Sequence, residues 1–122
     1  MESALLNELA SLGCSVEQSL DETYMGNESF YESILRKLPR TMCLKRMRAA
    51  LDARDAKALF EASHELKGLY ATLGLMPLFT MCSEIVEITR IGGLDGVEER
   101  LDRLLTRHDE FVAVIGGHQP SA

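Results

Sequence analysis

The stretch that decides the fold reads SHELKGLYATLGL and spans residues 63–75. It belongs to a predicted helix that begins at Asp55 and ends at Gly74. Apolar residues recur there every three or four positions, so they share one face of the helix: Leu59, Ala62, Leu66, Leu69 and Leu73. At about 100° per residue, His64 falls on the opposite side of the helix and is expected to face solvent.

Small and basic residues surround His64 on this exposed face. Lys67 and Gly68 follow it by three and four positions, and Ala71 lies one turn further on. A glycine inside a helix costs about 1 kcal/mol relative to alanine, and core packing does not explain one on a solvent-facing surface. The cost is explained if another molecule must approach His64 closely across Gly68 and Ala71.

These neighbours point to a specific chemistry for His64. An imidazole is largely neutral at cellular pH and can act as a nucleophile. The ammonium group of Lys67 can stabilise an anion placed on the ring. We therefore interpret His64 as the acceptor of a phosphoryl group from a docked partner. The alternative is an ordinary surface histidine, and the joint spacing of Lys67, Gly68 and the pair Leu73-Gly74 argues against it.

The motif His64-Glu-Leu-Lys67-Gly68, followed by Leu73-Gly74, resembles the signature of histidine-containing phosphotransfer (HPt) domains. Upstream segments are also similar to the N-terminal helices of bacterial members: Leu12-Gly13-Cys14-Ser15, Met25-Gly26-Asn27-Glu28 and Phe30-Tyr31. The resemblance covers roughly residues 5–115 and implies a helical bundle that carries phosphate on His64.

The chain departs from the family pattern at three places. Leu69 and Tyr70 replace residues that are often small and polar, and this change is expected to alter how a partner docks. Val86 follows Ile85 where Glu or Gln is common, which is expected to remove a polar group near the transfer face. Pro39 interrupts the second long helix.

The resemblance implies a phosphocarrier rather than an enzyme. His64 would exchange a phosphoryl group with the aspartate of a response-regulator receiver domain or a hybrid sensor kinase, and Lys67 would stabilise the phosphoryl oxygens. The docking surface is expected to include Gly68, Ala71, Lys57 and Glu61. Mg²⁺ would come with the receiver, and no cofactor or metal of its own is expected. Without a nucleotide-binding motif, the domain should not phosphorylate itself from ATP.

Three other functions remain open. One is a non-catalytic helical interaction module that binds receiver domains without phosphotransfer. Another is a phosphoacceptor fragment of a larger hybrid sensor kinase, although the Met1 start and the glycine-rich end favour a free-standing protein. The third, a histidine-dependent hydrolase, is disfavoured because no Ser or Cys nucleophile pairs with His64.

Composition restricts the fold and the location. The 122 residues indicate a single domain at 1–122, with a core at about 5–115 and a flexible tail at 116–122. The net charge of −6 argues against a nucleic-acid binder. No run is apolar enough for a membrane span, no signal peptide is visible, and the three separated cysteines suit a reducing cytoplasm. A monomer is expected, because one histidine face needs no dimer.

Helix signals predict an all-α protein, an antiparallel four-helix bundle with one or two short extra N-terminal helices. One short helix ends at Gly13, and Ser15 with Gln18 predicts a capping box for the next. Asn27 is the expected cap of a long helix that breaks at Pro39. Its apolar face resumes through Met42, Met47, Ala50 and Leu51. Another helix starts at Pro77 and stops at Gly92-Gly93, with Asp95 as the expected cap of the last one.

The last helix carries a regular apolar face, at Val97, Leu101, Leu104, His108, Phe111 and Ile115. His108 is therefore predicted to be a core histidine with a satisfied hydrogen bond. His118 lies in the tail and is given no role. The spacing of the three histidines does not fit a zinc site.

Eight of the 13 basic residues gather in a short run, at Arg36, Lys37, Arg40, Lys45, Arg46, Arg48, Arg54 and Lys57. Within that run, only Asp52 and Asp55 oppose them. The run is either a solvated helix face or a surface that steers the acidic pocket of a receiver domain. Lys57, two turns before His64 on the same face, is the strongest candidate for steering.

Overall fold

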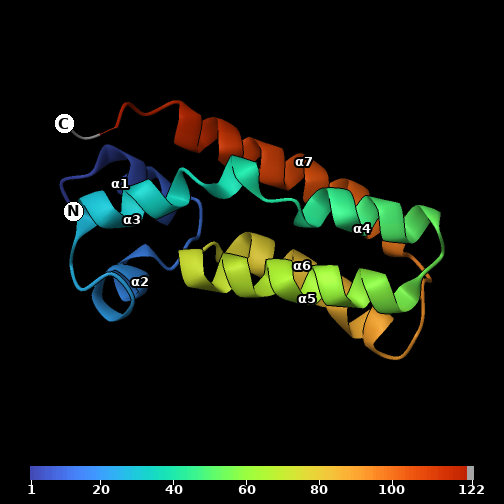
Figure 1. Cartoon of the computed structure of the whole chain (residues 1–122). Helices are drawn as coiled ribbons and strands as arrows, with labels where there is room; N and C mark the ends of the chain where they lie inside the picture. Colours follow the sequence, from blue (N-terminus) through green and yellow to red (C-terminus); the bar gives the residue numbers. More distant parts are fainter. Residues whose placement is uncertain (121–122) are drawn as a thin grey trace.

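In the computed structural model, which describes residues 1–120, the chain is built of helices without any strand (Figure 1). The elements are α1 (Ala4–Ser11), α2 (Val16–Glu22), α3 (Glu28–Leu35), a 3₁₀ helix (Leu38–Arg40), α4 (Cys43–Asp52), α5 (Ala56–Leu73), α6 (Met76–Arg90) and α7 (Val97–Gly116). The predicted all-α fold class is confirmed. Residues 121–122, the end of the predicted tail, lie outside the described part.

The longer helices run side by side in alternating directions, with α5 between α4 and α6 and with α7 against α6 and α4 (Figure 1). α1, α2 and α3 gather at one end, beside the C-terminal ends of α5 and α7. Each long helix therefore buries one face and leaves another to solvent. Among residues 1–120, we find no helix with the length and apolar character needed to cross a membrane.

The predicted break at Pro39 is confirmed. α3 ends at Leu35, Pro39 lies in the 3₁₀ helix, and α4 begins at Cys43. The expected inward position of Met42 is wrong, because it occupies the N-cap position of α4 and its side chain is 56% exposed. Cys43 and Leu44 are buried instead, beside the correctly predicted Met47, Ala50 and Leu51.

Two of the predicted side-chain caps are present. Asn27 Oδ1 accepts from the Phe30 amide at 3.0 Å, and Asp55 Oδ1 accepts from the Ala58 amide at 3.0 Å. Each carboxylate or amide oxygen satisfies a donor that the first turn leaves unpaired. The start of α5, and with it the orientation of its faces, is therefore held by Asp55.

Two other predicted caps are wrong. Ser15 makes no capping bond; its hydroxyl points instead to the carbonyl oxygen of Gly74, at 3.4 Å. Asp95 does not cap α7, because Gly96, in a left-handed conformation with φ of 72°, occupies the cap position without a side chain to accept a bond. In both cases the chain conformation around the helix start overrides the local sequence pattern.

Gly74 joins the end of α5 to the N-terminal helices. Its φ of 71° is the expected left-handed C-cap, and a side chain there would collide with Ser19 and Tyr31. The Tyr31 hydroxyl donates to the Leu73 carbonyl at 2.6 Å, and the Ser15 amide donates to the Gly74 carbonyl at 3.0 Å. These bonds satisfy the last carbonyls of α5, and they fix that helix at the end beyond Gly68 and Ala71.

Candidate functional site

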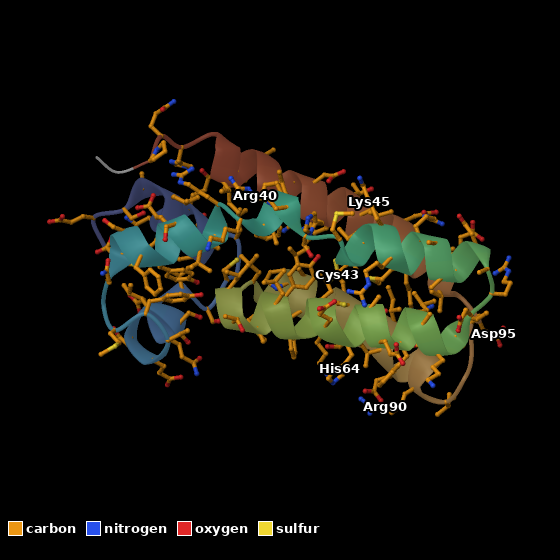
Figure 2. The ribbon with its side chains drawn as sticks, viewed as in Figure 1. Arg40, Cys43, Lys45, His64, Arg90 and Asp95 are labelled. Carbon is orange, nitrogen blue, oxygen red and sulfur yellow. The ribbon has the colours of Figure 1, made fainter. Side chains whose placement is uncertain are left out.

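His64 lies near the middle of α5 and is exposed, as the periodicity predicts. Figure 2 shows it on the side of α5 that points away from α7. The opposite face is buried and comprises Leu59, Ala62, Ser63, Leu66, Tyr70 and Leu73. The Ser63 hydroxyl donates to the Leu59 carbonyl at 2.6 Å, so the polar member of this buried face is satisfied.

Gly68 and Ala71 leave open space on the exposed face beyond His64. Both residues are exposed, and a Cβ added to Gly68 would meet no atom within 4 Å. Close packing against a neighbouring helix therefore does not explain this glycine. The backbone of α5 is bare at this point, so another molecule can approach close to the imidazole.

Lys67 extends toward α6 rather than freely into solvent. Its side chain is half-buried, and Nζ lies 5.3 Å from the centroid of the Phe79 ring. This is a cation–π contact between α5 and α6. The contact holds a positive charge one turn after His64, on the C-terminal side of α5.

The sequence prediction missed an aromatic contact on the other side of His64. The Phe60 and His64 ring centroids are 5.7 Å apart, with an angle of 32° between the ring planes. The guanidinium of Arg90, from α6, lies 5.3 Å from the Phe60 centroid. The spacing of four residues between Phe60 and His64 could have indicated their contact. No local pattern links Arg90 to α5.

A polar cluster lies next to His64 on the side of α4. Arg46 Nη1 and the Cys43 thiol, at 3.3 Å, both donate to Oε2 of Glu65. The hydrogen bond from Arg46 lowers the pKa of Glu65, and burial raises the pKa of the Cys43 thiol. The carboxylate of Glu65, the residue after His64, is therefore paired with Arg46 and Cys43. Across residues 1–120, no group of three Cys, His, Asp or Glu side chains is placed to hold a metal ion.

Two of the three departures from the family pattern lie in the core. Tyr70 is fully buried, and its hydroxyl is 2.8 Å from Nδ1 of His108. Val86 is also fully buried. The expected effects of Tyr70 on docking and of Val86 on the polarity of the transfer face are therefore wrong, because neither side chain reaches the surface. Leu69 is partly buried.

The basic run is divided among several surfaces. Asp52 and Asp55 are the acidic residues within the run, and further partners come from other parts of the chain. Arg46 pairs with Glu65 of α5, and Arg48 pairs with Asp102 of α7 at 2.5 Å. Arg36 donates to the Ile115 carbonyl at 3.1 Å and pairs with Glu32 at 3.3 Å.

The basic residues nearest the 3₁₀ helix do not face the partner that would dock on His64. Figure 2 shows Arg40 and Lys45 at the edge of the bundle opposite to His64 and Arg90. Lys57 is exposed and has no ion-pair partner among residues 1–120. Of the run, Lys57 remains the candidate for steering. Glu61, which was predicted to belong to the docking surface, is exposed.

The other two histidines are in different environments. His108 is buried and bonded to Tyr70, so the prediction of a satisfied core histidine is confirmed. Burial lowers the pKa of His108 and raises that of Tyr70. His118 Nε2 lies 2.7 Å from a carboxylate oxygen of Glu8. This contact joins the end of the described chain to α1.

The fold and the site together define a class of protein: a small helical bundle that presents one histidine on an open helix face. The family model described as "Hpt domain" matches residues 41–114, more than half of the chain, and the chain belongs to this family. No significant match was found among curated proteins or among solved structures. Hpt domains are phosphocarrier modules of two-component phosphorelays, and they interact with receiver domains of response regulators or kinases.

Proposed function

We propose that His64 receives a phosphoryl group from the aspartyl phosphate of a receiver domain and passes it to a second receiver. The observation that carries this proposal is the open surface over Gly68, directly beside an exposed histidine. A receiver domain that docks there, over Gly68 and Ala71, brings its aspartyl phosphate within reach of the imidazole. Lys57 and Glu61 lie on the same face and contact the rim of the docked domain.

The transfer is a direct displacement at phosphorus. The lone pair of Nε2 attacks, an N–P bond forms, and the P–O bond to the aspartate breaks. The aspartate leaves as a carboxylate, and the ring keeps its proton on Nδ1. The return step reverses these changes with a second receiver. Mg²⁺ is held by the receiver, where it neutralises the charge on the phosphoryl oxygens.

Lys67 stabilises the phosphoryl oxygens from α5 itself. Its cation is already confined by the Phe79 ring of α6, so little freedom is lost when it pairs with the phosphoryl group. The domain carries the group without taking it from ATP, and it works as a monomer in the cytoplasm, where receiver domains are found. These assignments describe a carrier, in which the second reactive group always belongs to the partner.

A phosphotransfer assay tests the proposal. The protein is incubated with phosphorylated receiver domains encoded in the same genome and with Mg²⁺, beside the variants His64→Ala and Lys67→Ala. We expect acid-labile, base-stable phosphate on the wild type, none on His64→Ala and slow labelling of Lys67→Ala. If receivers bind the wild type but none transfers phosphate to it, the non-catalytic interaction module is the better description.

A further inference from the structure

Phe60 packs against His64 from the preceding turn of α5. The ring centroids are 5.7 Å apart and the planes differ by 32°, so the two rings are tilted neighbours on the same side of α5. Phe60 is half-buried, whereas His64 is exposed. An exposed histidine side chain otherwise samples several orientations about its two side-chain torsions. A ring held beside the imidazole removes part of that freedom.

Arg90 holds Phe60 from the neighbouring helix. Its guanidinium lies 5.3 Å from the Phe60 centroid, and the same group is paired with Glu87 at 3.3 Å. Arg90 is the last residue of α6, and Figure 2 shows it at the same edge of the bundle as His64. The end of α6 therefore reaches His64 through Phe60, although no direct bond joins Arg90 to the imidazole.

We propose that Phe60 and Arg90 are positioning residues for phosphoryl transfer, an inference that rests on the function proposed above. A displacement at phosphorus requires the Nε2 lone pair to point along the line of the breaking P–O bond. When a receiver domain docks, the position of its phosphoryl group is set by the docking surface. The imidazole must then be held in one orientation relative to that surface, and Phe60, supported by Arg90, holds it.

The chain offers a matched control on α7. Arg107 lies 4.8 Å from the Phe111 centroid and pairs with Glu110 at 2.8 Å, so it makes the same two kinds of contact as Arg90. The Phe111 ring has no ring contact with a histidine within residues 1–120. Loss of Arg107 therefore removes the same two kinds of contact, made here to the buried Phe111 ring, without touching the site.

The experiment compares two phosphoryl donors. The first is a phosphorylated receiver domain at saturating concentration. The second is phosphoramidate, a small donor that needs no docking; its P–N bond breaks, the phosphoryl group passes to His64, and ammonia leaves. If Phe60 and Arg90 position the imidazole, their loss should slow transfer from the receiver but not from phosphoramidate. A freely diffusing donor can reach the imidazole in any orientation.

We expect Phe60→Ala to slow saturated transfer from the receiver about tenfold and Arg90→Ala about threefold. Phosphoramidate should label both variants within about twofold of the wild-type rate. Phe60→Tyr, which keeps an aromatic ring, and Arg90→Lys, which keeps a cation, should each transfer phosphate at close to the wild-type rate. Arg107→Ala should match the wild type. Phe60→Leu keeps apolar bulk, so a slow rate in that variant cannot be assigned to a loss of folding.

The results separate this inference from the function on which it rests. Wild-type rates in Phe60→Ala and Phe60→Leu with the receiver would overturn the positioning role alone. Equal slowing with both donors would also overturn it, because the effect would then lie in the reactivity of the imidazole. A wild-type protein that takes phosphate from phosphoramidate but from no receiver would overturn the proposed function, and the positioning role with it.

Discussion

The chain uses two histidines of the bundle in opposite ways. His64 lies on the exposed face of α5, and its neighbours there include Gly68, which has no side chain, and Ala71, which has only a methyl group. His108 lies inside the bundle on α7, 4% exposed, with Nδ1 held by the Tyr70 hydroxyl. The two rings are chemically identical. Their difference shows that burial and hydrogen bonding decide whether an imidazole is available for reaction or serves the fold.

The largest expected effect comes from removing the buried imidazole of His108. His108→Ala should lower the free energy of unfolding by about 2–4 kcal/mol, because it leaves a cavity and an unpaired Tyr70 hydroxyl. The folded fraction should still accept phosphate at the wild-type rate. Urea unfolding and the phosphotransfer assay measure the two effects. His64→Ala is the control, and its stability should stay within about 0.5 kcal/mol of wild type.

A subtler change keeps the ring of Tyr70 and removes only its bond. Tyr70→Phe leaves Nδ1 of His108 without its buried partner, which should cost about 1–3 kcal/mol of stability. Phosphotransfer should not change, because Tyr70 is fully buried and lies on the opposite face of α5 from His64. A fall in the rate of transfer, at unchanged stability, would mean that this pair also affects the exposed face.

The buried faces of α7 and α5, which carry His108 and Tyr70, differ in how well the sequence predicts them. The stripe on α7 was predicted residue by residue, because its apolar positions repeat every three or four residues over five turns. On α5 the same reasoning placed Leu69 in the stripe and left Tyr70 out of it, and Tyr70 was expected to affect docking only because it departs from the family pattern. Tyr70 is polar at its tip, and its partner His108 lies 38 residues away, so no local pattern reveals that the hydroxyl is satisfied in the core.

The site was predicted to the extent that it lies on a single helix. His64, Lys67, Gly68 and Ala71 follow from spacing along α5, and their exposed or half-buried positions agree with it. Arg90 and the partners of Arg46 and Arg48 come from packing between helices. Periodicity indicates which face of a helix is buried, but it does not indicate which residue of the next helix lies opposite.

The pH dependence of stability offers a sharper test of the buried environment. Burial lowers the pKa of His108 below its ordinary value of 6.5, while the nearby charge of Asp109 acts in the opposite direction. The unfolded chain therefore binds a proton at a higher pH than the folded chain. Stability should be unaffected above pH 6.5 and should fall as the pH decreases toward the lower, folded pKa, by at most about 1.4 kcal/mol per pH unit.

The clean measurement uses a protein in which His108 is the sole histidine. The double variant His64→Ala with His118→Ala removes the other two of the three histidines in the chain. Urea unfolding between pH 5 and 8 should show the decrease in this background. When His108 is also replaced by Leu, the free energy of unfolding should no longer show this decrease with falling pH. An unchanged pH dependence after His108→Leu would contradict a buried neutral imidazole.

The smallest expected effect concerns the open face, where access to His64 is kept at the expense of helix stability. Gly68→Ala should raise the free energy of unfolding by about 0.5–1 kcal/mol, because alanine is the better helix former and the added methyl meets no atom. The same methyl projects where we propose that the receiver docks, so transfer should slow while labelling by phosphoramidate stays constant. Gly116→Ala, at the end of α7, also adds a methyl to open space and should leave transfer unchanged. If Gly68→Ala stabilises the protein and transfers phosphate at the wild-type rate, close approach over Gly68 is not what this glycine provides.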